Sequence, residues 1–374
     1  MRKVLIIGAG IAGLGAAVSI ARAGDNVRVV ERSTSLAVGA AISMLYRGPD
    51  ALAELGVLDA CIAEGTVGYL DSVFSRMYDS SGDARRLPQL PVRSDGMPSY
   101  IIIYRPVIAR ILSGQAEAHG AVIDRGLAVS SLNDEGETVA VTFSDGTSDH
   151  YDLVVGADGT ASETRQHLFG DTAQIDYSGN MSLRWVKPDA PTGPVGFYVS
   201  EESVPVVIHP LHGGLVYIAT GVDMENRHVG TDEARQLFRE ILGQFDAPYV
   251  RELLSVVSDD DPVIARPYLM HHHPRPWHKG RIVLIGDAVH TLAANLGAGG
   301  VLGLEDGLVL GQELARTESL DAALAAFEER RFERTSNAVA ASREMLDAQV
   351  NRQASPAELH VIRERAVADL SKPF

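Results

Sequence analysis

The feature that most constrains this chain is the glycine-rich segment that follows its first apolar run. Residues 3–7 (KVLII) have the length and composition of a buried strand, and residues 8–13 (GAGIAG) come next. Residues 11–23 have a helical pattern, and residues 26–31 (NVRVVE) have the pattern of a second strand. A strand, a helix and a strand in this order predict a parallel sheet covered by helices.

The same segment predicts a bound dinucleotide. Glycines let a diphosphate approach the backbone, and the free N–H groups at the start of a helix favour an anion. Glu31 ends the second strand, where a carboxylate can accept both hydroxyls of an adenosine ribose and would repel the 2′-phosphate of NADP. A glycine-rich turn without a ligand is the structural alternative. The expected contacts are Gly8, Gly10, Ala12, Gly13, Glu31 and Arg32.

The rest of the chain changes character twice. Residues 49–64 and 105–118 have helical spacing, and residues 121–155 alternate like an antiparallel meander that ends in a strand at 152–155. Between about 170 and 270 the pattern is strand-rich, with one helix near 231–245. An apolar strand then returns at 281–286, and long helical patterns follow.

This order predicts an α/β fold in two domains. A Rossmann-like nucleotide-binding domain with a parallel sheet is built from both ends of the chain, and it carries an inserted α+β substrate domain on an antiparallel sheet. We place the first domain at 1–68, 98–169 and 272–345, the second at 69–97 and 170–271, and a C-terminal helical segment at 346–374.

Composition excludes several classes of partner. The formal net charge of −16 over 374 residues argues against nucleic acid and against an anionic membrane surface. Cys61 is the single cysteine, so no intrachain disulfide can form and a reducing compartment is expected. Because no apolar stretch reaches about 20 residues, we expect a cytoplasmic protein, as a monomer or a homodimer.

Two further motifs favour FAD over NAD as the dinucleotide. Residues 152–165 read DLVVGADGTASETR. Residues 286–290 read GDAVH, and the segment continues through LGAGG at 296–300 to Glu305 and Asp306. With these motifs in order, the chain resembles the flavoprotein aromatic hydroxylases, the family that includes para-hydroxybenzoate and salicylate hydroxylases. The resemblance covers nearly the whole chain.

The resemblance implies roles for particular residues. Asp287 would bind a ribityl hydroxyl of FAD, while Asp158 and Gly159 would lie where protein meets both FAD and the nicotinamide. For each aspartate, a helix cap or turn is the alternative. The backbone amides of Gly297, Gly299 and Gly300, ahead of a helix, would face the flavin pyrimidine edge, which suits an anion. Arg105 would contact the ribityl–pyrophosphate region, and Arg47 would contact the flavin or the pyridine nucleotide unless it is a surface residue.

The resemblance also implies the reaction. NADH or NADPH reduces FAD, O₂ adds at flavin C4a, and the hydroperoxide attacks an electron-rich carbon of a small aromatic or heteroaromatic substrate. No second glycine motif is present in the sequence, so the pyridine nucleotide is expected to bind transiently over the same flavin. No catalytic side chain in the usual sense is required. The polar candidates on the inserted strands are Arg184, Tyr198, His209 and Tyr217, and each has a core or surface alternative.

The chain departs from the family pattern near the flavin. Ala294 stands where the family usually has a proline, and Ala298 and Val301 stand where glutamine and asparagine are frequent. An epoxidase, a decarboxylating hydroxylase, a related reductase, an NAD-dependent dehydrogenase and a non-catalytic FAD-binding regulator remain as alternatives. The triplet at 271–273 (HHH) does not predict a metal site, since adjacent residues of an extended segment point to opposite faces.

Overall fold

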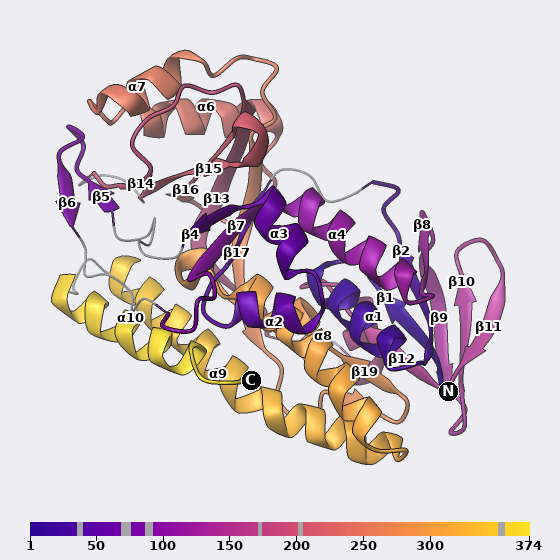
Figure 1. Cartoon of the computed structure of the whole chain (residues 1–374). Helices are drawn as coiled ribbons and strands as arrows, with labels where there is room; N and C mark the ends of the chain where they lie inside the picture. The colour runs from indigo at the N-terminus through magenta and orange to yellow at the C-terminus, as the bar shows by residue number, and fades with distance from the viewer. Residues whose placement is uncertain (36–39, 69–75, 87–92, 171–173, 201–204, 351–355) are drawn as a thin grey trace.

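A parallel sheet lies at one end of the computed structural model, which describes residues 1–374 except 36–39, 69–75, 87–92, 171–173, 201–204 and 351–355 (Figure 1). Its strand order is β18-β19-β12-β1-β2-β8, and only the edge pair β18–β19 is antiparallel. Val4, Leu5 and Ile6 of the central strand are fully buried, as their apolar run predicts. The strands are β1 (Lys3–Ile7), β2 (Asn26–Glu31), β8 (Val122–Arg125), β12 (Leu153–Gly156), β18 (His278–Lys279) and β19 (Ile282–Leu284).

A second, larger sheet is mostly antiparallel. Its order is β20-β17-β13-β16-β15-β14-β5-β6, and β14 pairs with β5 in parallel. One face of this sheet is covered by α6 and α7 (Figure 1), whose apolar residues form a separate core with Leu183, Trp185 and Ile218. The strands are β5 (Arg76–Tyr78), β6 (Ala84–Arg86), β13 (Asp176–Pro188), β14 (Gly196–Tyr198), β15 (Val206–Leu211), β16 (Leu215–Asp223), β17 (Ile264–His272) and β20 (His290–Thr291).

Two three-stranded sheets complete the strands of the described residues. One has the order β11-β10-β9, and the other has the order β3-β7-β4 and lies between the two large sheets. The meander expected at 121–155 is therefore correct only in its middle, because its first strand, β8, pairs with β2 in the parallel sheet. The strands are β3 (Ala41–Met44), β4 (Thr66–Gly68), β7 (Tyr100–Tyr104), β9 (Val129–Asp134), β10 (Val139–Phe143) and β11 (Ser148–Tyr151).

The helices cover the parallel sheet and extend beyond it. The single helix expected at 49–64 is wrong: α2 and α3 are separate, because Gly56 between them adopts a left-handed φ of +75°. The boundary expected at residue 346 falls inside α9. The helices are α1 (Ile11–Arg22), α2 (Gly48–Glu54), α3 (Leu58–Glu64), α4 (Arg105–Ala118), α5 (Glu163–Phe169), α6 (Thr231–Leu242), α7 (Pro248–Ser255), α8 (Gly299–Arg316), α9 (Leu320–Val350) and α10 (Pro356–Leu370). In the described part of the chain, none of them is both long and apolar enough to cross a membrane.

The closest helix packing in the fold joins α1 to α8. A Cβ at Gly307 would lie 2.3 Å from the backbone nitrogen of Ala16, and a Cβ at Gly311 would lie 2.1 Å from the Ser19 hydroxyl. Only glycine therefore allows this approach. The contacts advance together along both helices, so α1 and α8 are parallel and their N-termini lie at the same end. The pairs are Ala12 with Gly303, Ala16 with Gly307, and Ser19 with Gly311.

We expect Gly307→Ala to lower the free energy of unfolding by about 1–3 kcal/mol, because the added methyl meets backbone atoms that cannot move aside. Gly114→Ala is the matched control: Gly114 lies on the exposed side of α4 with nothing within 4 Å of a Cβ. There the same change should raise stability by about 0.5–1 kcal/mol. Urea unfolding of both variants measures the difference. A Gly307→Ala variant as stable as wild type would contradict the tight contact.

Candidate active site

The glycine-rich loop between β1 and α1 has one open position. A Cβ at Gly8 would lie 2.4 Å from the Ala157 carbonyl oxygen, and a Cβ at Gly13 would lie 2.0 Å from the Gly8 carbonyl oxygen. These two glycines are required by packing. A Cβ at Gly10, by contrast, would meet nothing within 4 Å. Gly10 thus leaves free space at the N-terminus of α1, which is the space a diphosphate needs to approach the backbone.

Glu31 is tied to that loop. Its carboxylate accepts hydrogen bonds from the backbone N–H of Ala9 (3.0 Å) and of Ser33 (2.9 Å). A carboxylate has about four acceptor positions, so these two bonds leave room for hydroxyl donors. The neighbouring Arg32 is exposed. The expected ribose acceptor therefore lies beside the expected phosphate site, and it also braces the loop.

The loop after β19 brings Asp287 to the same region. A Cβ at Gly286 would lie 2.7 Å from the Ala12 side chain, so this loop rests on the first turn of α1. Asp287 is accessible to solvent but is surrounded by protein on most sides. This partial removal from water raises the pKa of Asp287, although the charges of His290, Arg105 and Arg184 oppose the shift.

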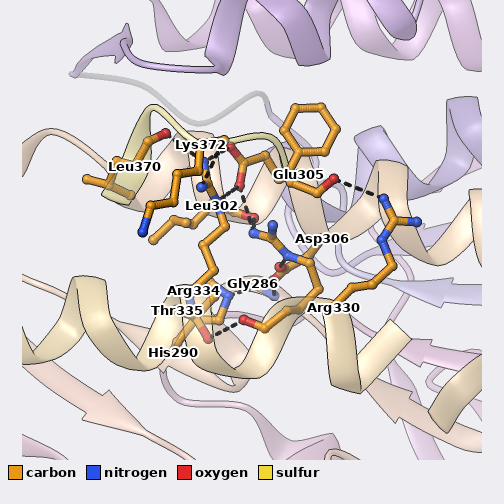
Figure 2. Close-up of polar contacts among 12 residues, drawn as sticks. Gly286, His290, Leu302, Glu305, Asp306, Arg330, Arg334, Thr335, Leu370 and Lys372 are labelled. Atoms are coloured by element: carbon orange, nitrogen blue, oxygen red, sulfur yellow. Dashed lines mark hydrogen bonds and ion pairs between the residues drawn. The ribbon is translucent and has the colours of Figure 1, made fainter. Parts of the chain in front are cut away.

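Behind this loop, Asp306 of α8 holds three groups at once (Figure 2). It accepts hydrogen bonds from the backbone N–H of Gly286 (2.9 Å) and from Arg331 Nε (2.7 Å), and His290 Nε2 lies 2.6 Å from its carboxylate. The side chains of Asp306, His290 and Arg331 are fully buried. Burial opposes ionisation of Asp306, but His290 and Arg331 outweigh it and lower the pKa to about 2. The loop that carries Asp287 is thus fixed by a buried carboxylate.

The anchor continues to the last helices. Arg331 also pairs with Glu305 at 2.9 Å, and Arg334 of α9 forms a bidentate pair with Glu305, with both N···O distances at 2.8 Å. Arg334 further donates to the backbone carbonyl of Leu370 at the end of α10 (2.7 Å). Figure 2 shows Glu305, Arg334 and Leu370 close together. Through this chain of contacts, α9 and α10 support the loop of Asp287.

Asp158 binds the start of α5, whose N-cap residue is Ser162. Its carboxylate accepts from the Ser162 hydroxyl (2.5 Å) and from both the N–H (3.0 Å) and the hydroxyl (2.9 Å) of Thr164. Its backbone nevertheless touches the glycine-rich loop, with its Cα 3.3 Å from the Cβ position of Gly8. Gly159, the next residue, is left-handed with φ of +82° and has open space around it.

The start of α8 presents uncapped backbone. Its N-cap is Ala298, which forms no side-chain hydrogen bond, and Gly297 has a left-handed φ of +61°. A Cβ at Gly300 would lie 2.3 Å from the Ile42 side chain, so β3 packs tightly here. The first amides of α8 and the start of α1 are together at one end of two parallel helices. This end carries the positive ends of both helix dipoles.

Two predicted arginines border this region. Arg105 is the first residue of α4, and its charge acts on Asp287. Arg47 precedes α2 and pairs with Asp50 at 3.2 Å, and Asp50 also binds Arg93. Arg47 is therefore partly neutralised by Asp50, whereas the charge of Arg105 lowers the pKa of Asp287 against the effect of burial.

The substrate-side candidates separate into two groups. Arg184, His209 and Tyr217 lie on the face of the large sheet opposite α6 and α7, on neighbouring strands where His209 and Tyr217 are paired. Tyr198 does not join them. It is buried in the core under α6 and α7, where it stacks on Tyr78 at 4.7 Å and donates to the Pro194 carbonyl. Tyr198 is therefore a core residue, which is the alternative that the sequence also allowed.

The three remaining candidates have defined charge states. Burial lowers the pKa of His209 to about 4, so its imidazole is neutral at neutral pH. Burial raises the pKa of Tyr217 to about 12, against the charge of Arg184. Arg184 donates from Nε to the Ser182 hydroxyl at 3.0 Å. This face therefore offers a cation, a neutral imidazole and a phenol, and none of them is a strong base.

Sequence reasoning missed the anchoring residues. Glu305 and Asp306 interrupt the apolar stretch at residues 299–311 of α8, and an acidic pair in such a stretch requires buried partners. The acidic pair could therefore have been predicted to have buried partners. The sequence does not show that these partners are Arg331 and Arg334. The histidines at 271–273 lie at and just after the end of β17 and contact neighbouring protein groups. His271 lies near Arg165, and His272 lies 3.0 Å from the Thr335 hydroxyl. The described residues contain no group of three or more side chains suited to a metal ion.

The donor set fits FAD. Open backbone at Gly10, two helix N-termini and the carboxylates Glu31 and Asp287 supply what a diphosphate, a ribose and a polyhydroxyl chain require. Comparison with known proteins agrees. A family model described as FAD binding domain matches residues 1–342.

Proteins that are named as FAD-dependent monooxygenases or hydroxylases match most of the chain. The chain is 28% identical to a putative FAD-dependent monooxygenase, YetM, of Bacillus subtilis, over 89% of this chain and 90% of that protein. It is 28% identical to an FAD-dependent urate hydroxylase of Klebsiella pneumoniae, over 92% and 90% of the two chains. It is 26% identical to a 6-hydroxynicotinate 3-monooxygenase of Bordetella bronchiseptica, over 89% and 88%.

Solved structures agree with these relatives. The crystal structure of Klebsiella pneumoniae HpxO complexed with FAD and uric acid superposes with a TM-score of 0.79 at 25% identity, covering 99% of this chain and 95% of that one. The mixed α/β fold, with its parallel and antiparallel sheets, is thus the fold of known FAD-dependent hydroxylases. The chain belongs to the family of FAD-dependent aromatic hydroxylases and is an FAD-dependent monooxygenase.

Proposed function

We propose that this monooxygenase uses NADH or NADPH to hydroxylate a small heteroaromatic substrate, which binds between FAD and the face of the large sheet that carries Arg184, His209 and Tyr217. One observation supports this most strongly: β20, which begins three residues after Asp287, belongs to the large sheet and pairs there with β17. The substrate face and the cofactor site are therefore adjacent. The names of the relatives, which act on urate and 6-hydroxynicotinate, support a heteroaromatic ring.

In this proposal the two large sheets correspond to two domains. The FAD-binding domain is Rossmann-like and comprises residues 1–68, 98–169 and 272–345, and the substrate domain comprises 69–97 and 170–271. The separate hydrophobic cores of the two sheets support the division. The C-terminal part of the chain contains α10, and the contact of its last residue, Leu370, with Arg334 supports the loop of Asp287.

The cofactor assignments follow the geometry of the site. The amides at the start of α1, with open space at Gly10, would bind the diphosphate, and Arg105 would lie beside it. Glu31 would accept the ribose hydroxyls, and Asp287 would accept a ribityl hydroxyl. The amides of residues 297–300 would face the flavin. Arg32, Arg47 and Gly159 are assigned to the border of the site.

Bound FAD, reduced by NADH or NADPH, supplies the electrons with which O₂ places one oxygen atom in the product and the other in water. The residues of this chain prepare the substrate. Arg184 favours an anionic form of the ring, such as a deprotonated hydroxyl, by placing a positive charge beside it. Tyr217 remains protonated and can donate a hydrogen bond, and neutral His209 can orient the ring. An anionic ring is the more electron-rich nucleophile, so this charge arrangement favours hydroxylation.

Glu31→Ala should weaken FAD binding by roughly tenfold to a hundredfold, since a hydrogen bond to a charged acceptor contributes about 1.5–3 kcal/mol. The variant also loses the brace to Ala9 and Ser33. Glu31→Gln keeps one carbonyl acceptor, so its affinity for FAD should lie between those of wild type and Glu31→Ala. FAD retained after gel filtration measures the effect. Stoichiometric FAD in the alanine variant would remove Glu31 from the cofactor site.

Asp287→Asn should raise the stability of the FAD-free protein and weaken the binding of FAD. Because the pKa of Asp287 is raised, the folded FAD-free protein holds this proton to higher pH than the unfolded chain does, and stability falls as pH rises through that window. At neutral pH the asparagine variant should therefore unfold at a higher temperature without FAD, yet bind FAD more weakly. Below the ordinary aspartate pKa of about 3.9 the stability difference should vanish.

The control for this prediction is Asp260→Asn, an exposed aspartate far from the loop, which should change neither property. Thermal unfolding of the FAD-free protein and fluorescence titration with FAD are the two measurements. An Asp287→Asn protein that binds FAD as tightly as wild type would show that Asp287 has only a structural role.

The reaction class is tested with labelled oxygen. With a suitable heteroaromatic substrate, NADH or NADPH oxidation should accelerate, and ¹⁸O from ¹⁸O₂ should appear in the product. Without substrate, consumption should be slow and should yield hydrogen peroxide, because excluding water from the site is what suppresses this leak. A product labelled from water, or turnover that continues without O₂, would contradict monooxygenation and leave the FAD assignment intact.

A further inference from the structure

We infer that Tyr46 is a positioning residue that fixes the backbone amides at the start of α8 by holding the turn that precedes them. Its hydroxyl donates a hydrogen bond of 2.6 Å to the backbone carbonyl of Leu296. Leu296 ends the short 3₁₀ turn η4 (Ala294–Leu296), and Gly297, Ala298 and the first residue of α8 follow directly. The inference rests on the proposed function, in which these amides face the flavin.

The backbone at Tyr46 supports a specific role. Its φ is +53°, a left-handed conformation that bulky residues rarely adopt. Such a conformation persists only where surrounding contacts determine it, and it is concentrated at functional sites. Tyr46 is half-buried between two apolar clusters, one formed with α9 and α10 and the other between the sheets. Tyr46 therefore connects the turn to both apolar clusters.

The turn itself has little internal restriction. Ala294 begins it, and alanine does not fix φ as proline would. Its shape depends on external contacts, of which Tyr46 is one. A second lies opposite: the Asn295 side chain donates to the Ser342 carbonyl (2.8 Å) and accepts from the Ser342 hydroxyl (2.7 Å). The turn is thus held from the β3–α2 connection and from α9.

The residues next to Tyr46 pack directly against the segment that carries these amides. A Cβ at Gly297 would lie 3.0 Å from the Leu45 side chain, and a Cβ at Gly48 would lie 3.1 Å from Val301. Residues 45–48 therefore contact both ends of the segment from Leu296 to Val301. Burial raises the pKa of Tyr46 to about 12, so the hydroxyl stays protonated and remains a donor throughout the working pH range.

The test compares Tyr46→Phe with Tyr249→Phe. Tyr249 is the matched control, since its hydroxyl also donates to a backbone carbonyl, that of Pro191 at 2.9 Å, but in the core under α6 and α7. Amide hydrogen exchange is measured on FAD-free and FAD-loaded protein. In Tyr46→Phe the amides of residues 296–301 should exchange about fivefold faster, as expected when one neutral hydrogen bond is lost. The control should leave them unchanged.

Two further readouts separate positioning from general stability. In Tyr46→Phe loaded with FAD, the midpoint potential should become more negative, because displaced amides stabilise the negative charge of reduced flavin less well. Ala294→Pro should restore both potential and exchange in the double variant. Ala293 already has φ −64° and ψ 155°, which suits a residue before proline.

Unchanged exchange at 296–301 in Tyr46→Phe would overturn the inference, as would equal effects from Tyr249→Phe. A double variant without rescue would also overturn it, since proline would then restrict the turn without replacing the anchor. The exchange measurement on FAD-free protein is independent of cofactor chemistry. If wild type bound no FAD, the proposed function would fail while the exchange result still decided whether Tyr46 holds the turn.

Discussion

The contact between α1 and α8 is the constraint on which the site depends. Glycines at 307 and 311 let the two helix backbones touch, and the parallel arrangement places both N-termini side by side. Parallel helix dipoles repel each other, so close packing must offset that cost in the free protein. In the proposed site, the negative charge of a dinucleotide diphosphate would remove part of this repulsion. The parallel packing of α1 and α8 therefore lowers stability when no ligand is bound, and it favours an anionic ligand.

A buried ionic anchor gives the second half of the site its shape. Asp306 faces Arg331, His290 and the Gly286 amide, and all three side chains are fully buried. Removing one partner from such a buried set is strongly destabilising. An apolar replacement of the whole set would preserve packing. It would not supply the acceptor that fixes the Gly286 amide, and with it the direction of Asp287. The anchor therefore contributes orientation to the cofactor loop as well as stability.

The local parts of this arrangement could be predicted from sequence, and the non-local parts could not. The strand, glycine loop and helix at residues 3–23 follow from short-range patterns, as does the carboxylate Glu31. Asp306 meets Arg331 at a separation of 25 residues only because α8 and α9 pack together. Of the four polar candidates on the inserted strands, Tyr198 lies in the core under α6 and α7, and alternation along a short strand does not reveal which face meets the helices. The left-handed turn at Tyr46 has no local sequence signature.

The pairing of α1 with α8 also has a consequence during synthesis. About 300 residues separate the two helices, an interval of roughly 15–60 s at ordinary elongation rates. Throughout that interval the small-residue face of α1 has no partner, and the glycine loop lacks the neighbour that holds it in shape. The strand and helix at residues 3–22 are thus completed long after they emerge. Cofactor capture is a late event in the life of the nascent chain, and an early pause exposes α1 without its partner.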